Sequence, residues 1–298
     1  MSKVFRSVAD LKGFSIKNCA AMPDPGRVLM CPPDHYDVVD VKNPFMREHV
    51  GKVNKAAAQQ EWTMLREAFE QAGKPVVTIP AVAGLEDMVF AANQALTGLT
   101  PRMERVAVLS SMQHPSRRRE VPFFEAWFKE QGYTVKRLKS ATAHFEGAGD
   151  AIWHPGKRLL WGGHGFRSES EVYDEVSEIF DAPVVNLKLV NESFYHLDTC
   201  FCPLTPEAVL IYPSAFDATS LELILKLFPV VLTATEAEAV RYMACNAAVI
   251  DGRTAVIQKG TSSVRRHMEA MGLAVVEVET TEFMKSGGSA YCLKNWLY

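Results

Sequence analysis

Cys292 is the residue of this chain that is best placed to act as a nucleophile, because two glycines lead into it. The segment 286–292 reads Ser-Gly-Gly-Ser-Ala-Tyr-Cys, with Gly287 and Gly288 shortly before the sulfur. Glycine allows tight backbone turns, so this segment can hold a thiolate in a confined, partly buried place. A free cysteine is more often an inert part of a protein core. Taken alone, the motif leaves both interpretations open.

Acidic residues on flexible segments provide candidate partners for this sulfur. In the segment 144–150, Glu146 and Asp150 flank a turn that contains two glycines. Paired carboxylates can hold a cation or orient a general acid, and a solvated surface loop is the alternative. The segment 86–93 adds Asp87 and Asn93, acidic and amide groups that flank an apolar, strand-like run.

A histidine and a further carboxylate lie in the segment 195–202. If this segment is a β-strand, then His196, Asp198, Cys200 and Cys202 share one face, because side chains alternate along a strand. An imidazole beside a carboxylate is suited to proton transfer. Two alternatives remain, a hydrogen-bonded core histidine and a metal site on His196 and the two cysteines. The Cys-x-Cys spacing is not that of the usual zinc site.

Two arginines and the surplus of acids indicate the charge of the substrate. Arg167 follows a glycine-rich stretch and Arg117 opens a basic run that ends at Glu120. Arginine in such a loop can bind a carboxylate through two hydrogen bonds, although either residue could equally lie in solvent. The acids favour a positively charged guanidinium or amine over an anionic substrate. The residues alone therefore predict thiol chemistry on a small cationic molecule.

The composition limits the class of protein. With 48% hydrophobic and 22% charged residues, the chain is typical of a globular protein, and no apolar run is long enough to span a bilayer. A net charge of −3 and scattered basic residues argue against a nucleic-acid partner. The six cysteines are expected to be reduced thiols. The N-terminal region lacks a secretory pattern, so we expect a cytoplasmic protein; a mitochondrial presequence is the alternative, against which Asp10 argues mildly.

The elements that must position these residues repeat five times along the chain. Helical stretches at 56–72, 122–131, 168–180, 220–228 and 262–271 each follow a strand-like run and lead into another one. Glycine ends three of these helices, at Gly73, Gly132 and Gly272, as expected for the residue after a helix. Five strand–helix–strand units predict a modular α/β protein.

A doubly wound nucleotide-binding fold would also alternate strands and helices. Such a fold needs a G-x-G-x-x-G or G-x-x-x-x-G-K-[ST] sequence between a strand and a helix. Neither is present, and the glycines at 162–165 follow a strand without the pyrophosphate spacing. Nucleotide binding is therefore not expected.

Taken in order, these motifs resemble those of the amidinotransferase and guanidino-hydrolase superfamily. The resemblance covers nearly the whole chain and rests on 30–33 with Asn43-Pro44, 87–93, His114-Pro115 with Arg117, 145–150, 165–167, His196-Leu197-Asp198, and Gly287-Gly288 with Cys292. It implies a single catalytic domain over 1–298 with the pentein fold, a five-bladed α/β propeller of ββαβ modules around a central site. The five units counted above fit this fold.

The resemblance also implies a covalent mechanism without metal or organic cofactor. Cys292 would attack the guanidinium carbon of an arginine-like substrate, with its thiol pKa lowered by the substrate's charge and by His196. His196 would protonate the departing amine and then activate the water that releases the adduct. Glu146 and Asp198 would hold the guanidinium. The remaining substrate-binding residues would be Asp87 or Asn93, Asp150, Asn43, and Arg117 and Arg167 for the α-carboxylate.

Two departures from the superfamily pattern bear on the substrate. Arginine deiminases carry an aspartate where this chain has Ala92 and Asn93, which argues against plain arginine deimination. Lys294 stands where threonine is frequent, and it could stabilise the thiolate or point into solvent. The chain looks most like dimethylarginine dimethylaminohydrolases, with arginine dihydrolases nearly as close.

Three further possibilities stay open at this point. An arginine deiminase or dihydrolase would release different products, and an amidinotransferase would use an amine in place of water. A non-enzymatic binding protein of the same fold would have no use for the thiol, imidazole and acids together. A homodimer is compatible with the sequence.

Overall fold

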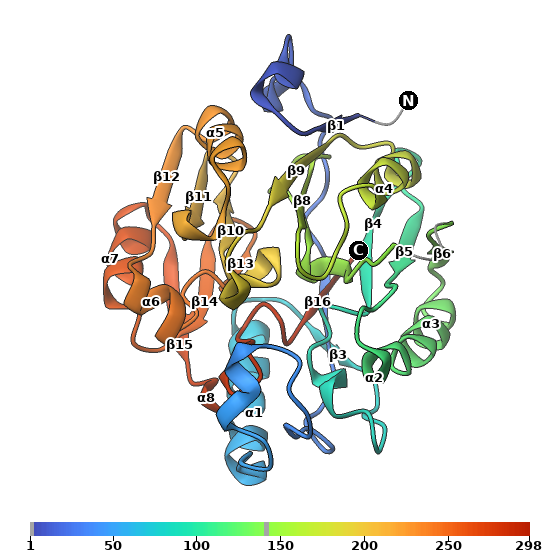
Figure 1. Cartoon of the computed structure of the whole chain (residues 1–298), viewed down its shortest axis with the longest axis vertical. Coiled ribbons are helices and arrows are strands. Elements are labelled where there is room, and N and C mark those ends of the chain that lie inside the picture. The colour runs from blue at the N-terminus through green and yellow to red at the C-terminus, as the bar shows by residue number, and fades with distance from the viewer. Residues whose placement is uncertain (1–2, 140–142) are drawn as a thin grey trace.

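Five small β-sheets form the framework of the protein (Figure 1). The computed structural model describes residues 3–139 and 143–298. In each of the five sheets a middle strand pairs antiparallel with one neighbour and parallel with the other. We call the antiparallel neighbours the inner strands, because all five contribute residues to one shared cavity.

The strands are listed here by their position in the sheets. The inner strands are β4 (Ala95–Leu99), β7 (Ala151–Trp153), β10 (Phe201–Thr205), β13 (Ala248–Ile250) and β16 (Asn295–Leu297). The middle strands are β2 (Arg27–Met30), β5 (Arg105–Leu109), β8 (Leu160–His164), β11 (Ala208–Ile211) and β14 (Thr254–Gln258). The outer strands are β3 (Val76–Thr78), β6 (Thr134–Arg137), β9 (Val184–Lys188), β12 (Val230–Thr233) and β15 (Ala274–Val278). The short β1 (Val4–Phe5) adds a fourth strand parallel to β9.

A helix connects each middle strand to the outer strand that runs parallel to it. These helices are α1 (Lys55–Gln71), α3 (Val121–Glu130), α4 (Val172–Phe180), α5 (Ala218–Leu227) and α7 (Ser262–Ala270). The five predicted strand–helix–strand units are therefore present, with bounds within a few residues of those expected. Gly73, Gly132 and Gly272 follow their helices with φ of 84°, 76° and 88°, the left-handed conformation that glycine accepts without strain.

Shorter elements fill the connections. They are the helices α2 (Pro115–Arg118), α6 (Glu236–Arg241) and α8 (Thr281–Met284), and the 3-10 helices that include Glu86–Val89, Gly147–Gly149 and Leu197–Thr199. The segment 86–93 is thus a turn of 3-10 helix where we expected a strand-like run. In 195–202 only the last two residues belong to a strand, because β10 begins at Phe201.

The chain closes on itself through its last strand. β16 pairs antiparallel with β2, with Trp296 opposite Val28, so the first sheet is assembled from both ends of the described chain. Cys292 lies three residues before β16. This pairing fixes the nucleophile segment to the framework rather than leaving it as a loose tail.

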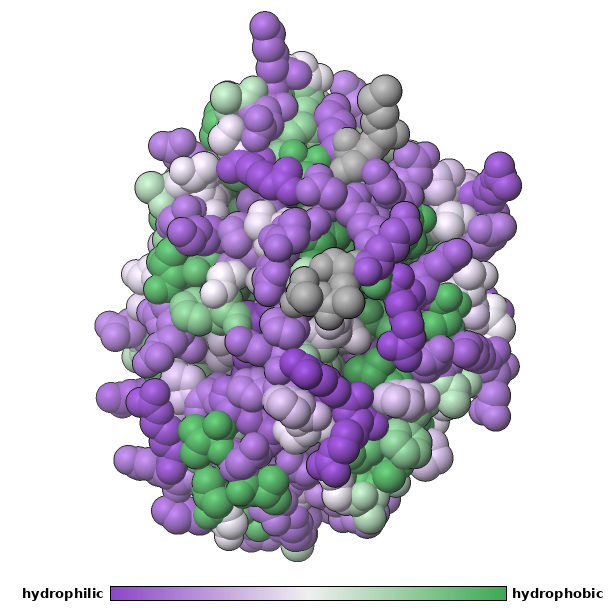
Figure 2. All heavy atoms as spheres, turned by 45° about the vertical axis from the view of Figure 1, so that its right-hand side comes forward, coloured by the Kyte–Doolittle hydropathy of each residue, from purple (hydrophilic) through white to green (hydrophobic). Residues whose placement is uncertain are grey.

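The surface is mostly polar, whereas the interior contains three clusters of buried apolar side chains. Figure 2 shows one face of the molecule, on which hydrophilic residues predominate and hydrophobic ones form separate groups. Within the described residues, no helix has the length and apolar character needed to cross a membrane.

Candidate active site

Polar side chains gather at the N-terminal ends of the inner strands. Each inner strand is preceded, within three residues, by one member of the set Asn93, Asp150, Asp198, Asn246 and Cys292. These side chains are all buried. The five equivalent loops thus bring together residues that lie far apart in the sequence.

A small cavity of about 320 Å³ opens among these loops. Seven of the ten residues predicted from the sequence line it, namely Asn43, Asp87, Asn93, Arg117, Arg167, His196 and Cys292. The other three, Glu146, Asp150 and Asp198, do not line the cavity but bond to residues that do or to their chain neighbours. The structure therefore brings the whole predicted set together.

The glycine pair before Cys292 is required by close packing. Gly287 has φ of 77°, and a Cβ there would lie 2.6 Å from the Tyr195 hydroxyl oxygen. A Cβ on Gly288 would lie 2.7 Å from the Phe90 ring and 3.0 Å from the Cys292 Cβ. Because separations this short are not tolerated, a larger residue at either position would displace the wall of the cavity.

The Cys292 sulfur is held between a carboxylate and an amide. Its Sγ lies 3.1 Å from Asp198 Oδ2 and 3.1 Å from Asn246 Nδ2, and the side chain is 3% exposed. Burial raises the pKa of the Cys292 thiol well above its usual value, and the nearby Asp198 raises it further. The protein's own groups therefore favour the protonated thiol, and the lowering of its pKa by the positive charge of a substrate stays a prediction.

Asp198 shares a proton with this sulfur. Burial raises the pKa of its carboxyl to about 7, against the opposing effect of the hydrogen bond from Cys292. Its second oxygen, Oδ1, is buried and has no hydrogen-bond partner within the described part of the chain. This oxygen is therefore an unused acceptor close to the nucleophile.

His196 is oriented by Glu146 on the other side of the cavity. His196 Nε2 lies 2.7 Å from Glu146 Oε2, which also accepts from Arg167 Nη1 at 3.0 Å. Glu146 Oε1 accepts from the Gln113 amide at 3.0 Å. Although burial by itself raises the pKa of Glu146, Arg167 and His196 outweigh it and hold that pKa well below its usual value. Both oxygens of Glu146 are thus already used within the protein.

Asp150 positions the loop that carries His196. Its Oδ1 accepts from the Leu197 amide at 3.0 Å, and its Oδ2 accepts from the Ser168 hydroxyl at 2.7 Å. Burial raises the pKa of Asp150 to about 6, against the opposing charge of His196. Both oxygens of Asp150 are thus occupied within the protein, which favours a role in positioning over contact with a ligand.

Arg117 connects Asn93 to the acidic side of the site. Arg117 Nη1 donates to Asn93 Oδ1 at 2.9 Å, and Nη2 donates to the Asp87 carbonyl oxygen at 3.1 Å. Glu120 lies 3.1 Å from the same guanidinium. The Asn93 Nδ2 group is buried and has no acceptor among the described residues. Asn93, which lines the cavity, therefore has an unused N–H donor.

Asp87 offers free acceptors on the cavity wall. Neither of its carboxylate oxygens has a hydrogen-bond partner in the described residues, although Lys42 Nζ lies 3.1 Å from Oδ2 as an ion pair. Burial by itself lowers the pKa of Lys42, but the carboxylates of Asp87, Asp40 and Glu86 outweigh burial and raise that pKa to about 12. Asp87 is thus a carboxylate on the cavity surface with free oxygens, and Asp198 has one unpaired oxygen beside the nucleophile.

Asn43 ties the loop above the cavity to the nucleophile segment. Its Nδ2 donates to the Ser286 carbonyl oxygen at 2.9 Å, and its Oδ1 accepts from the Phe45 amide at 3.0 Å. Tyr195 donates to the Gly287 carbonyl oxygen at 2.8 Å. These bonds stabilise the glycine turn from outside.

Asn246 is the residue of the site that sequence reasoning missed. Besides its contact with the sulfur, its Oδ1 accepts from the amides of Ser289 and Cys292 at 2.8 and 3.2 Å. Its Nδ2 also donates to the Asp198 carbonyl oxygen at 2.9 Å. Asn246 lies just before β13 as Asn93 lies just before β4, and this repeated position is the signal that could have identified it.

The expected shared face of His196, Asp198, Cys200 and Cys202 is wrong. The 3-10 helix Leu197–Thr199 interrupts the alternation, so Cys200 Sγ lies 3.5 Å from the Leu197 carbonyl oxygen and Cys202 Sγ lies 3.4 Å from the Ala247 carbonyl oxygen. The alternative metal site on these residues is not formed, and within 3–139 and 143–298 no group of three or more His, Cys, Asp or Glu side chains could hold a metal ion.

The chain is similar to known proteins over most of its length. A family model described as eukaryotic N,N dimethylarginine dimethylhydrolase matches residues 36–295. The bifunctional arginine dihydrolase/ornithine cyclodeaminase ArgZ of Synechocystis sp. is 40% identical over 274 residues, which are 91% of this chain and 38% of that protein. The N(G),N(G)-dimethylarginine dimethylaminohydrolase of Mycobacterium tuberculosis is 30% identical over 91% of this chain and 85% of that protein.

A solved structure is similar over nearly the same length. The crystal structure of the N-terminal domain of an ArgZ variant, covalently bound to a reaction intermediate, has a TM-score of 0.86 and 38% identity. The alignment covers 91% of this chain and 97% of that domain. The chain spans less than two fifths of the length of ArgZ itself, so it corresponds to one part of that protein.

Proposed function

The chain belongs to the N,N-dimethylarginine dimethylhydrolase family, and on that premise we propose that it hydrolyses the guanidino group of arginine or of an Nω-methylated arginine. Cys292 would act as the nucleophile of this reaction. The observation that supports the proposal is the cavity itself, which is lined by Cys292, His196 and Asp87 with its free oxygens, while Asp198 contacts the Cys292 sulfur from outside the cavity surface.

Substrate binding is assigned to the groups that have unused acceptors. A guanidinium group presents N–H donors and a positive charge, so Asp87 and the free Oδ1 of Asp198 are its natural partners. Glu146 was expected to share this role, but its oxygens already bind His196, Arg167 and Gln113. We therefore assign Glu146 to the orientation of His196. Arg117 and Arg167 both line the cavity and each is paired with a glutamate, Glu120 and Glu146 respectively, so both remain candidates for binding the α-carboxylate.

The chemical steps follow from the positions of the sulfur and the imidazole. The bound cation stabilises the thiolate, and the thiol proton passes to Asp198, whose carboxylate is 3.1 Å away. The thiolate attacks the guanidinium carbon and forms a C–S bond. The C–N bond then breaks, with His196 donating a proton to the departing ammonia or methylamine. Water activated by His196 attacks the same carbon and releases Cys292.

Arginine itself is the second candidate substrate, with dihydrolase chemistry as the outcome. Two observations favour it over methylarginine. The identity to the arginine dihydrolase ArgZ is 40%, against 30% to the dimethylaminohydrolase. Asn93 also has an unused amide N–H donor at the position where arginine deiminases carry an aspartate, which is an acceptor. Such a donor suits a carbonyl-like intermediate, which a dihydrolase must attack with water a second time.

A substrate panel tests this proposal. Purified protein is incubated with arginine, Nω-methylarginine and Nω,Nω-dimethylarginine, and citrulline, ornithine, ammonia, methylamine and dimethylamine are measured. Citrulline with methylamine or dimethylamine supports the dimethylaminohydrolase, and ornithine with two equivalents of ammonia supports the dihydrolase. Transfer to added glycine would support an amidinotransferase. No release from any of these guanidines would contradict the proposal.

The finer features of architecture and location belong to the same proposal. We propose that the five sheets are the blades of a pentein propeller and that 1–298 is a single catalytic domain. The order of strands, repeated in five sheets and closed by β16, supports this arrangement. A cytoplasmic location and a homodimer remain predictions from the sequence.

A further inference from the structure

Lys294 is a buried lysine that has no partner. Its side chain is completely buried two residues after Cys292, and its Nζ has no hydrogen-bond acceptor among the described residues. Burying an ammonium group without an acceptor is costly, and lysines are therefore rarely found in this state. A methionine or leucine would fill the same space without that cost. The position of Lys294 therefore calls for a functional explanation.

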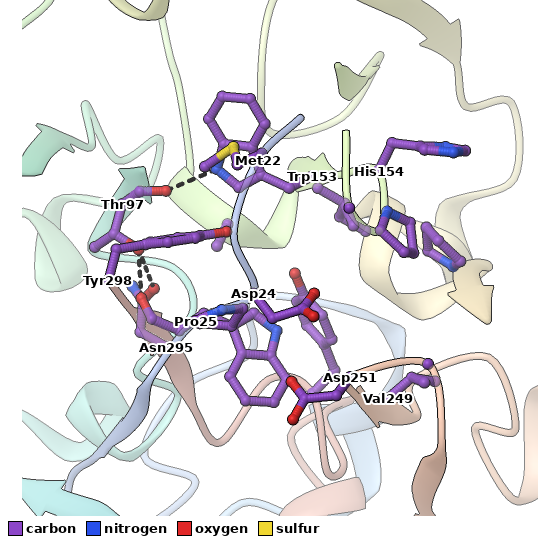
Figure 3. A pocket seen from close by; sticks show the side chains of 18 of the residues that line it. Met22, Asp24, Pro25, Thr97, Trp153, His154, Val249, Asp251, Asn295 and Tyr298 are labelled. Carbon is purple, nitrogen blue, oxygen red and sulfur yellow. Dashed lines mark hydrogen bonds between the residues drawn. The ribbon is translucent and has the colours of Figure 1, made fainter. Parts of the chain in front are cut away.

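Two aromatic rings surround the amine. Lys294 Nζ lies 3.0 Å from the centroid of the Tyr291 ring and 4.6 Å from that of the Trp296 ring. An ammonium ion over the face of an aromatic ring is stabilised by the ring's quadrupole. Both rings line the larger cavity of Figure 3, whereas Cys292 lines the catalytic one. Lys294 thus lies in a segment, 291–296, that contributes residues to both cavities.

The acidic groups that act on Lys294 are those of the nucleophile. Burial lowers the pKa of Lys294 well below its usual value, and the charges of Asp198, Cys292 and Cys202 oppose that effect. In turn, Lys294 lowers the pKa of Asp198 against the larger effect of burial. Three further titratable groups act on Lys294, Asp198 or Cys292: Tyr195, Tyr291 and Cys202. The catalytic cavity beside them is lined by five more charged or titratable groups: His196, Asp87, Arg117, Arg167 and Lys42.

The other cations of the site are already neutralised. Arg117 is paired with Glu120, and Arg167 is paired with Glu146. Lys42 is paired with Asp40, Glu86 and Asp87. In the described part of the chain, Lys294 has no carboxylate within ion-pair distance. Burial favours the uncharged amine, so Lys294 gains its positive charge together with the negative charge on Cys292 and Asp198, which it then balances.

We propose that Lys294 is a positioning residue that stabilises the ionised form of the Cys292–Asp198 pair through its ammonium charge. This proposal rests on the proposed function and names a further residue of the same site. Ionisable groups this close titrate as one unit. Removing the positive charge leaves Cys292 protonated up to higher pH, so fewer molecules carry the thiolate at neutral pH.

The test measures ionisation of Cys292 without turnover. Wild-type protein, Lys294→Met and Lys294→Arg are treated with iodoacetamide across a pH series, and alkylation of the peptide that contains Cys292 is quantified by mass spectrometry. Because only the thiolate reacts, the midpoint of the profile reports its formation. We expect Lys294→Met to raise the midpoint by at least about one pH unit. Lys294→Arg, which keeps a permanent charge, should leave it at or below the wild-type value.

Lys74 provides the matched control. It is also buried, lines the other cavity, and has partners, since Nζ bonds to Asp251 Oδ1 and to the Pro25 carbonyl oxygen, both at 2.7 Å. Lys74→Met should leave the Cys292 midpoint unchanged. A purely structural effect of losing a buried lysine would appear in both methionine variants.

The outcomes separate this proposal from the proposed function. An unchanged midpoint in Lys294→Met would overturn the role of Lys294, even if the wild type hydrolyses arginine. If Lys294→Met does not fold, Lys294→Arg decides, because a midpoint above the wild-type value would overturn the proposal and one at or below it would support it. A wild type inactive on every guanidine would instead refute the proposed function, whatever the alkylation profiles show.

Discussion

The five inner strands have a cavity at each end, and the two cavities differ in what holds their polar groups. At the N-terminal ends, buried side chains bond mainly to one another, as in the contacts of His196 with Glu146 and of Cys292 with Asp198. The other cavity, of about 820 Å³, is shown in Figure 3. There Trp153 Nε1 donates to the Thr97 carbonyl oxygen, and the carboxylates Asp24 and Asp251 are exposed.

This difference separates a reactive site from a structural one within one framework. A network of buried, mutually bonded side chains fixes charge and orientation before a substrate arrives, which is what electrostatic catalysis needs. Polar groups that bond to the backbone or to solvent mainly satisfy the hydrogen-bonding groups of the folded chain. The larger cavity is therefore not the better candidate for chemistry. The predictions that follow compare the two ends.

The largest expected effect comes from the two cysteines at opposite ends. Cys292→Ser should lower turnover of the active guanidine by at least about 10³-fold, because a hydroxyl in place of the thiol is a far weaker nucleophile. Cys202→Ser, in the other cavity, should retain activity. Turnover and thermal unfolding of both variants provide the measurement. Comparable activity in the two variants would remove the distinction between the cavities.

His196→Ala should have the next largest effect. Loss of a general acid and base typically costs about 10²–10⁴-fold in rate. His154 offers a matched control, since it lies in the other cavity and its Nε2 contacts the Pro206 carbonyl oxygen at 3.1 Å. Steady-state kinetics of His196→Ala and His154→Ala should show the loss only in the first. An equal loss in both would indicate that the effect is structural.

Asp198 should make stability depend on pH. Its folded pKa of about 7 exceeds the usual 3.8, so its contribution to stability is complete below about pH 4 and is lost as the pH rises through 7. Asp198→Asn does not titrate. Relative to wild type, this variant should therefore gain at least about 1 kcal/mol of unfolding free energy between pH 5 and pH 8. Urea unfolding of both proteins at pH 5 and pH 8 measures this change. If the difference in unfolding free energy between Asp198→Asn and wild type is the same at both pH values, the raised pKa of Asp198 is refuted.

The smallest effect is expected at the mouth of the other cavity. Asp251 is exposed and pairs with Lys74, and exposed ion pairs contribute about 0–1 kcal/mol. Asp251→Asn should leave turnover within about twofold of wild type, because its charge is not part of the catalytic network. Kinetics at low and moderate salt would check this. A large loss would mean that the two cavities act together.

Hydrophobic periodicity predicted the framework well, because it reflects burial that the framework requires. The helix that ends at Gly73 and the strand that follows it could be placed to within a few residues. The same method failed at 195–202, where the 3-10 helix Leu197–Thr199 replaces the expected strand. Short turns that satisfy their hydrogen bonds through side chains carry no periodic signal.

The site was predicted as a set of residues more successfully than as a set of contacts. Cys292, His196 and Arg167 could be identified from their motifs, but the sequence does not indicate which oxygens are already occupied. Glu146 was therefore assigned to the substrate although its contacts orient His196. Asn246 was missed because a single asparagine before a strand is common, and only the structure shows that it contacts the sulfur.

The most direct test of the account is to detect the covalent intermediate on Cys292. Wild-type protein is mixed with its best guanidine substrate, quenched in acid within the first turnovers, digested and analysed by mass spectrometry. The account predicts that the Cys292 peptide gains the mass of the substrate minus the departing ammonia, methylamine or dimethylamine. Turnover without this adduct, or an adduct on another cysteine, would contradict the central claim.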